Sequence, residues 1–211
     1  FNPYLKSICE TYAQWWDCYT ITDVVGKKRG EEKWRSAMLS PSPFFNFNLT
    51  VEKVKQEKEE ETERLTVLEG LFKYANDHVL LIGRPGSGKS TALLRLLLES
   101  AEEAQSVIAR GAKRNDAIPR TSGINQQIPI LVELRFYKTS IIQLIRDFLK
   151  RHQLWLEIAE IEKLLFEGRF LLLFDGVNEL SSETARQNLT KFRQDYQQTT
   201  PMIFTTRDLG V

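Results

Sequence analysis

The second half of the chain alternates short apolar runs with amphipathic stretches. The apolar runs are HVLLIG at 78–83, IPILVEL at 128–134, RFLLLFD at 169–175 and MIFTT at 202–206. Strands that are apolar at successive positions are typical of a parallel sheet buried on both faces, and regular alternation with helices indicates an α/β fold. We therefore predict an α/β fold with a parallel sheet and helices on both of its faces.

Four segments between these runs have apolar residues at helical spacing. They are KSTALLRLLLESAEEA at 89–104, SIIQLIRDFLKRH at 140–152, EIAEIEKLLFE at 157–167 and SETARQNLTKFRQDY at 182–196. Each repeats apolar residues every three or four positions, which is the pattern of one helical face. The polar segment 110–127 predicts a loop before the second strand.

The first 64 residues differ in character, and we treat 1–64 as a mainly helical N-terminal extension of a core at 65–211. Ile8, Tyr12 and Tyr19, with Trp15 or Trp16 between them, recur at three- and four-residue steps, which predicts one apolar face of a helix. That face either packs against the rest of the domain or docks a partner or an effector module.

Between this helix and the core we expect several irregular and charged segments. Residues 23–45 carry glycine and proline breakers and predict a loop, and 47–55 predicts a short strand that leads into a helix. The charged tract at 52–64 is typical of a solvated helix face. The next apolar periodicity predicts a helix over 62–75 that ends near 76–77.

Composition narrows the function classes. Net charge is +1, so the whole chain has no general attraction to nucleic acid or to an anionic membrane. The two cysteines, Cys9 and Cys18, are too few for a disulfide framework and match no zinc spacing. The longest apolar runs are far shorter than a membrane span, and no signal pattern opens the chain. We expect a soluble cytoplasmic protein with neither nucleic acid nor membrane as its partner.

The segment GRPGSGKS at 83–90 fits the pattern G-x-x-x-x-G-K-[ST] and stands between a predicted strand and a predicted helix. Glycines let the loop turn its N–H groups toward phosphate oxygens, and the helix N-terminus adds positive potential. Lys89 would contact the β- and γ-phosphates, Ser90 would bind Mg²⁺ and Thr91 would reach the α-phosphate. The predicted nucleotide-binding residues are Gly83, Arg84, Pro85, Gly86, Ser87, Gly88, Lys89, Ser90 and Thr91.

A second polar group follows the run that ends in FLLLFD. Asp175 stands at the strand end, where a buried carboxylate needs a metal or a charged partner, so we predict that it holds Mg²⁺ together with Ser90. Glu179 lies four residues further on, within reach of a water in line with the γ-phosphate. Asn178 places an amide where a second acid would fit.

The third group is FTTR at 204–207. A strand inserted between the loop strand and the acidic strand would direct its carboxyl end at the γ-phosphate. Arg207 would then sense or stabilise the γ-phosphate charge, and Thr205 or Thr206 would contact the attacking water. With Lys89 and Glu179, Arg207 completes the predicted catalytic set.

These motifs, in this order, resemble the NACHT family of the STAND class of P-loop NTPases. The resemblance rests on HVLLIGRPGSGKSTALLRLLLE at 78–99, RFLLLFDGVNEL at 169–180 with its small residue Gly176, and IFTTRDLG at 203–210. It is strongest over 65–211, where 65–93 looks like NACHT proteins of cyanobacteria. The resemblance implies a P-loop NTPase sheet and an ATP- or GTP-dependent switch in signalling or defence, on a chain with effector and sensor domains that self-associates.

The chain departs from the family pattern at two points. Many family members have an acid at the position of Asn178, and its loss would slow hydrolysis if that acid were the main base. The family also continues beyond the strand that ends near Arg207, so we expect an incomplete sheet with 78–83 at its edge. The chain would then be a fragment, a truncated product, or a protein that covers this edge with its N-terminal segment.

The sequence therefore leaves three functions open. The first is Mg²⁺-dependent binding and slow hydrolysis of ATP, with GTP as the other candidate, as the nucleotide switch of a signalling protein. The second is a nucleotide-binding module or remnant without useful turnover. The third, a DNA-acting or transport ATPase, is disfavoured because no LSGGQ segment and no long basic stripe are present.

Overall fold

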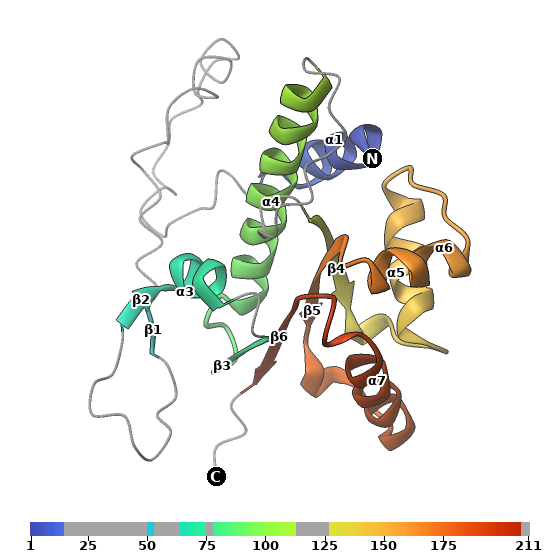
Figure 1. The fold of residues 1–211 in the computed structure, drawn as a ribbon. Helices are drawn as coiled ribbons and strands as arrows, with labels where there is room; N and C mark the ends of the chain where they lie inside the picture. Colours follow the sequence, from blue (N-terminus) through green and yellow to red (C-terminus); the bar gives the residue numbers. More distant parts are fainter. Residues whose placement is uncertain (15–49, 53–63, 75–77, 113–126, 208–211) are drawn as a thin grey trace.

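A computed structural model describes residues 1–14, 50–52, 64–74, 78–112 and 127–207. Within these ranges the protein is an α/β structure with a four-stranded, all-parallel sheet (Figure 1). The strands are β3 (Val79–Gly83), β4 (Ile128–Glu133), β5 (Phe170–Asp175) and β6 (Met202–Arg207). All four predicted apolar runs are therefore strands, and their carboxyl ends meet at one edge of the sheet, since the strands are parallel.

The strand order is β3-β6-β5-β4. The strand β6 is last in the chain yet lies between β3 and β5, which is the insertion that the sequence predicts. The register pairs Leu81 with Thr205 and Leu173 with Ile203. This register brings the ends of β3, β5 and β6 together, and each of these ends carries one of the three predicted motifs.

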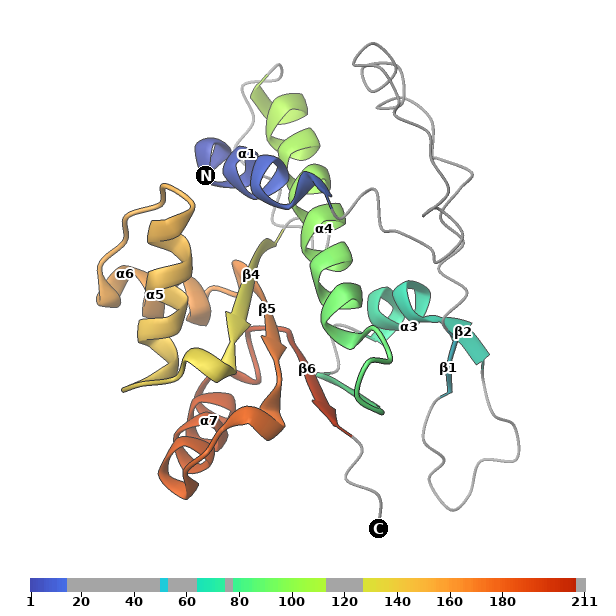
Figure 2. The same ribbon diagram turned by 180° about the vertical axis from the view of Figure 1, so that it is seen from behind.

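Helices flank the sheet on two sides (Figure 1, Figure 2). The helix α4 (Lys89–Ala112) lies on one side, and α5 (Ile141–Arg151), α6 (Ile158–Phe166) and α7 (Glu183–Tyr196) lie on the other. The short helices η5 (Leu134–Phe136) and η6 (Val177–Glu179) follow β4 and β5. The three helices predicted at 140–152, 157–167 and 182–196 are present within a residue or two, and α4 is longer than the periodicity indicated.

The extra length of α4 corrects the predicted loop at 110–127. The helix continues through Ala112, and 113–126 lie outside the described residues. The sequence of this last turn carries Arg110 and Gly111, which interrupt the apolar pattern without breaking the backbone hydrogen bonds of the helix. The polar character of 110–112 had suggested a loop, so the predicted end of the helix was too early.

The core lies between the sheet and both helix layers. Phe174 of β5 stacks on Phe204 of β6, with ring centroids 4.7 Å apart, and meets Phe192 of α7 edge to face. Because side chains alternate along a strand, Asp175 and Thr205 point to the opposite face, which is the α4 side. The apolar packing on one face thus orients the polar residues on the other.

The strand β3 lies at the edge of the sheet formed by the described residues. Leu80 and Ile82 are 52% and 48% exposed, although they face the same side as the buried Phe204. We had predicted that helices cover both faces of the whole sheet. Within the described ranges, one face of β3 is left uncovered. The edge position of 78–83 itself agrees with expectation.

The N-terminal helix α1 (Asn2–Tyr12) packs against the domain. Tyr4, Leu5 and Ile8 are fully buried, and the Tyr4 hydroxyl donates a 2.7 Å hydrogen bond to the carbonyl of Pro129 at the start of β4. This confirms the packing interpretation for the part of the helix that is described. Trp15, Trp16 and Tyr19, and the loop predicted at 23–45, lie outside the described residues.

A small antiparallel pair of strands precedes the core. The strand β1 (Thr50–Glu52), within the strand predicted at 47–55, pairs with β2 (Arg64–Thr66). The helix α3 (Val67–Tyr74) follows directly, so the helix predicted over 62–75 begins later than expected. Residues 64–66 use their backbone groups in the ladder with β1, a nonlocal pairing that overrides local helical periodicity. Of the charged tract predicted as a helix face at 52–64, Glu52 and Arg64 lie in these two strands, and 53–63 lie outside the described residues. The predicted helix end near 76–77 also lies outside them.

His152 is buried where α1 crosses the end of α5. Its Nδ1 lies 3.1 Å from the Ser7 hydroxyl, and its ring contacts the rings of Tyr4, Tyr12 and Phe148. Its Nε2 has no hydrogen-bond partner among the described residues. Burial, and secondarily the positive charge of Arg151, lowers the pKa of His152 to about 4.

We predict that His152 makes the fold sensitive to mild acid. Its pKa in the folded state, about 4, lies below the ordinary value of 6.5, so the unfolded chain binds a proton first as pH falls. Above pH 6.5 the histidine is neutral in both states and the fold keeps its full stability. The free energy of unfolding then decreases progressively as pH falls toward 4, because the unfolded chain gains the proton first. In urea unfolding experiments, the free energy of unfolding should fall by about 1–3 kcal/mol over this pH range. For the variant His152→Gln, the free energy of unfolding should depend less on pH. Parallel profiles for the two proteins between pH 7 and 5 would contradict this prediction.

Candidate functional site

The glycine-rich segment forms the turn between β3 and α4. Gly86 and Gly88 have φ angles of 75° and 83°, which residues with a Cβ rarely adopt. The turn is closed by a hydrogen bond from the Ser87 N–H to the Arg84 carbonyl, and α4 starts at Lys89. The unpaired N–H groups of the first helical turn therefore stand at the carboxyl edge of the sheet.

The Lys89 side chain folds back over this turn. Its Nζ donates hydrogen bonds to the carbonyls of Gly83 at 2.6 Å and Arg84 at 2.8 Å, and it lies 3.2 Å from the Ser87 hydroxyl. Burial lowers the pKa of Lys89, the nearby cation Arg207 lowers it further, and Asp175 acts in the opposite direction. Two cations thus face the same space, and an anion between them would relieve their repulsion.

Asp175 joins the glycine-rich turn to the central strand. Its Oδ1 accepts a 2.9 Å hydrogen bond from the Ser90 hydroxyl and a 2.7 Å hydrogen bond from the Thr205 hydroxyl. Thr205 is buried, and its oxygen also accepts a hydrogen bond from the Gly176 N–H at 2.9 Å. The cost of placing a carboxylate at the end of a buried strand is therefore offset by hydroxyl donors, and Lys89 is not its hydrogen-bond partner.

Sequence reasoning did not foresee this role for Thr205. We expected Thr205 or Thr206 to contact an attacking water, but the Thr205 hydroxyl is already bonded to Asp175 and to the backbone. The Thr205 hydroxyl keeps one free acceptor position, so the contact with water stays a prediction for either threonine. A signal existed in the sequence, since a threonine on the buried face of a strand needs a polar partner.

The short helix η6 carries Glu179 beside Arg207. Gly176 precedes this helix with a φ of 80°, and a Cβ at this position would lie 2.9 Å from the Glu179 carboxyl carbon. A glycine therefore allows the chain to turn back so that the Glu179 carboxylate approaches the strand ends. Its Oε1 lies 3.8 Å from the Arg207 guanidinium, and both side chains are partly exposed.

Asn178 lies beside Glu179 and contacts the same strand end. Its side-chain oxygen accepts a 3.0 Å hydrogen bond from the backbone N–H of Arg207. The amide at the position of a possible second acid thus binds the protein itself, which sequence reasoning did not foresee.

These groups line one open pocket of about 290 Å³ at the carboxyl ends of β3, β5 and β6. Four of the lining residues are ionic: the cations Lys89 and Arg207, and the anions Asp175 and Glu179. The pocket brings together all residues of the predicted nucleotide-binding, metal and catalytic sets except Gly83, which ends β3, and Arg84, which follows it. The lining residues are Pro85, Gly86, Ser87, Gly88, Lys89, Ser90, Thr91, Asp175, Gly176, Asn178, Glu179, Thr205 and Arg207.

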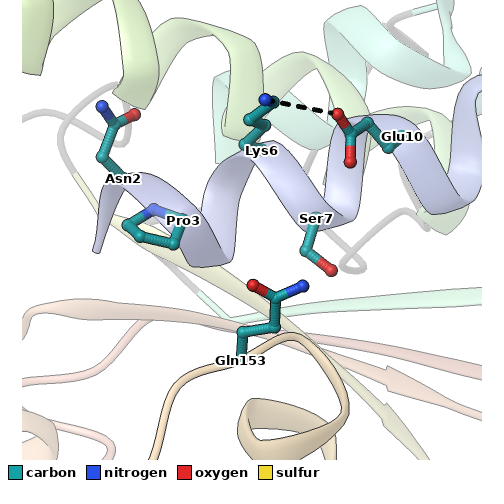
Figure 3. Close-up of a pocket in the computed structure, with 6 residues that line it drawn as sticks. All are labelled: Asn2, Pro3, Lys6, Ser7, Glu10 and Gln153. Carbon is teal, nitrogen blue, oxygen red and sulfur yellow. Dashed lines mark ion pairs between the residues drawn. The ribbon is translucent and has the colours of Figure 1, made fainter.

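A different pocket lies at α1 (Figure 3). It has a volume of about 380 Å³ and is lined by Asn2, Pro3, Lys6, Ser7, Glu10 and Gln153. Lys6 and Glu10 form an ion pair at 3.6 Å, drawn as the dashed line, and both side chains are largely exposed. Its two charges already neutralise each other, so this pocket presents no unbalanced group to a ligand.

The donor set at Asp175 restricts which metal would fit. No group of three or more histidine, cysteine, aspartate or glutamate side chains gathers within the described ranges, which argues against a zinc cage there. One carboxylate and one hydroxyl, Asp175 and Ser90, suit Mg²⁺, which keeps water and phosphate oxygens as its other ligands.

Comparison with protein-family models gives no match for this chain, and comparison with curated proteins gives none either. The helices of the described ranges include none that is long and apolar enough to cross a membrane. The interpretation of the pocket therefore rests on its own geometry and chemistry.

We predict that Thr205 orients Asp175. The variant Thr205→Val keeps the shape of the side chain but leaves Asp175 without one donor and the Gly176 N–H without its acceptor, which should cost about 1–3 kcal/mol. Thr205→Ser should recover most of this loss, since it restores the hydroxyl. The free energy of unfolding in urea measures both, and equal stability of the valine and serine variants would contradict this role.

Proposed function

We propose that this pocket binds the phosphates of a nucleoside triphosphate with Mg²⁺ and hydrolyses it slowly, as the nucleotide switch of a NACHT-like P-loop NTPase. The observation that carries the proposal is the hydrogen bond between Ser90 and Asp175, which lie 85 residues apart. Ser90 opens the helix after a phosphate-loop motif, and Asp175 ends the strand expected to carry the metal ligand. Their contact joins the two halves of a magnesium–triphosphate site.

The cationic groups support binding of phosphate. The turn at 83–88 presents the N-terminus of α4, and Lys89 and Arg207 converge on the same pocket. Lys89 now bonds to the carbonyls of its own turn, and a phosphate oxygen would replace these carbonyls as a stronger, charge-assisted partner. Thr91 also lines the pocket, in a position suited to the α-phosphate.

The metal ion would be held between Ser90 and Asp175, where it supplies charge that stabilises the phosphates. The Asp175 carboxylate, kept in place by Thr205, would orient its ligand oxygens toward the turn. Glu179 would position and deprotonate the attacking water, and Arg207 would stabilise the charge that develops on the γ-phosphate. In the described arrangement these last two side chains face each other at 3.8 Å, so substrate phosphate would compete with Glu179 for Arg207.

The alternative is a nucleotide-binding module without useful turnover. It is favoured by Asn178, which supplies no second carboxylate, and by the pairing of Glu179 with Arg207. ATP is our preferred nucleotide and GTP the other candidate. Association with effector or sensor domains, or with other copies, is part of the same proposal and follows from the resemblance to NACHT proteins. A cytoplasmic location stays a prediction from the composition of the chain.

We predict that Lys89→Ala strongly weakens triphosphate binding. Lys89 is the only lysine among the described residues that line the pocket, and loss of its charge-assisted phosphate contact should weaken binding of Mg²⁺–ATP at least about tenfold. The matched control Lys191→Ala removes an exposed lysine on α7 and should bind like the wild type. Titration calorimetry with ATP and with GTP measures the affinities of both variants. An unchanged affinity in Lys89→Ala would overturn the proposal.

We predict that Glu179→Gln separates binding from turnover. The amide cannot act as a base, so single-turnover release of labelled phosphate should fall by about 10²–10⁴-fold while binding persists. Glu183→Gln, at an exposed position on α7, is the matched control and should turn over normally. If the wild-type protein binds nucleotide but releases no phosphate above buffer, the binding module without turnover is the correct function.

A further inference from the structure

We propose that Asn178 is a positioning residue for Arg207, and that its neutral side chain suits the pocket to a highly charged phosphate ligand. The role of Asn178 in positioning Arg207 concerns the protein alone, whereas the role of its neutral charge rests on the proposed function. It begins from the hydrogen bond between the Arg207 backbone N–H and the Asn178 side-chain oxygen.

The need for such a bond follows from the register of the sheet. The ladder between β5 and β6 ends with the pair Phe174 and Phe204, because the chain turns away from β6 after Asp175. The strand β6 nevertheless continues to Arg207 beside β3. The Arg207 N–H, which faces β5 beyond the end of that ladder, therefore has no partner on β5, and the Asn178 side chain supplies its acceptor.

Two side chains thus hold the end of β6 to the turn that follows β5. Thr205 bonds to Asp175 and to the Gly176 N–H, and Asn178 bonds to Arg207 two residues further along β6. The Arg207 guanidinium projects from a backbone fixed at this point, and it lies close enough to Lys89 to lower the pKa of that lysine. The position of the guanidinium opposite the phosphate loop therefore depends on the Asn178 bond.

Asn178 also adds no charge to the pocket. Among the described residues that line the pocket, two are cations, Lys89 and Arg207, and two are anions, Asp175 and Glu179, so the formal charges of these four cancel. An aspartate at 178 would accept the same hydrogen bond but would add a third carboxylate and repel phosphate. An amide provides the acceptor without that repulsion.

The first test measures backbone amide exchange by NMR without nucleotide. In Asn178→Ala the Arg207 amide should exchange about two- to tenfold faster, which is the range for one hydrogen bond. Asn178→Asp should protect it as the wild type does. Asn188→Ala, which removes an exposed asparagine on α7 bonded to Tyr137, is the control and should leave Arg207 unchanged. Equal exchange in Asn178→Ala and wild type would overturn the positioning role.

The second test compares affinities for Mg²⁺–ATP and Mg²⁺–ADP. A misplaced Arg207 should contact the γ-phosphate poorly, so Asn178→Ala should lower the preference for ATP by about two- to tenfold. Asn178→Asp should keep the preference for ATP but should lower the affinity for both nucleotides, and this decrease should be larger at low salt. If exchange at Arg207 rises in Asn178→Ala and the preference is unchanged, the bond is structural only.

The two tests also separate this inference from the proposed function. A wild-type protein that binds neither nucleotide overturns the proposed function and the charge argument that depends on it. The exchange experiment still decides the positioning role in that case, because it uses no nucleotide.

Discussion

The site depends on one shared hydrogen-bond acceptor, the Oδ1 atom of Asp175. It receives the hydroxyls of Ser90 and Thr205, which lie 85 and 30 residues away in the chain. A carboxylate at the end of a buried strand is costly without donors, so these bonds hold three segments in one arrangement. The glycine-rich turn after β3, the turn after β5 and the end of β6 are linked through this atom.

The sheet order makes this convergence possible. The strand β6 lies between β3 and β5, and packing of Phe174, Phe192 and Phe204 on the α7 side directs Asp175 and Thr205 to the α4 side. The apolar core therefore sets which face carries the polar groups, and the turns after β3 and β5 complete the pocket. Ligands of open α/β sheets bind at such carboxyl edges, beside a point where the strand order changes direction.

Much of this arrangement could be predicted from the sequence, because the strands are continuous apolar runs and the helices keep a clear period. The position of β6 between β3 and β5 was also expected. The start of α3 was not, because β2 pairs with residues distant in sequence and local periodicity carries no sign of that pairing. The bonds of Thr205 and Asn178 were missed for the same reason, since they depend on the register of neighbouring strands.

The central claim is that Ser90 and Asp175 form a metal site that is completed by nucleotide phosphates. Replacement of Mg²⁺ by Mn²⁺ in an NMR titration tests this claim most directly, because Mn²⁺ broadens the resonances of nearby nuclei. With ATP present, Mn²⁺ should selectively broaden the resonances of residues 86–91, 175–176 and 205, and without ATP it should broaden them little. Broadening centred elsewhere in the chain, or none with ATP bound, would contradict it.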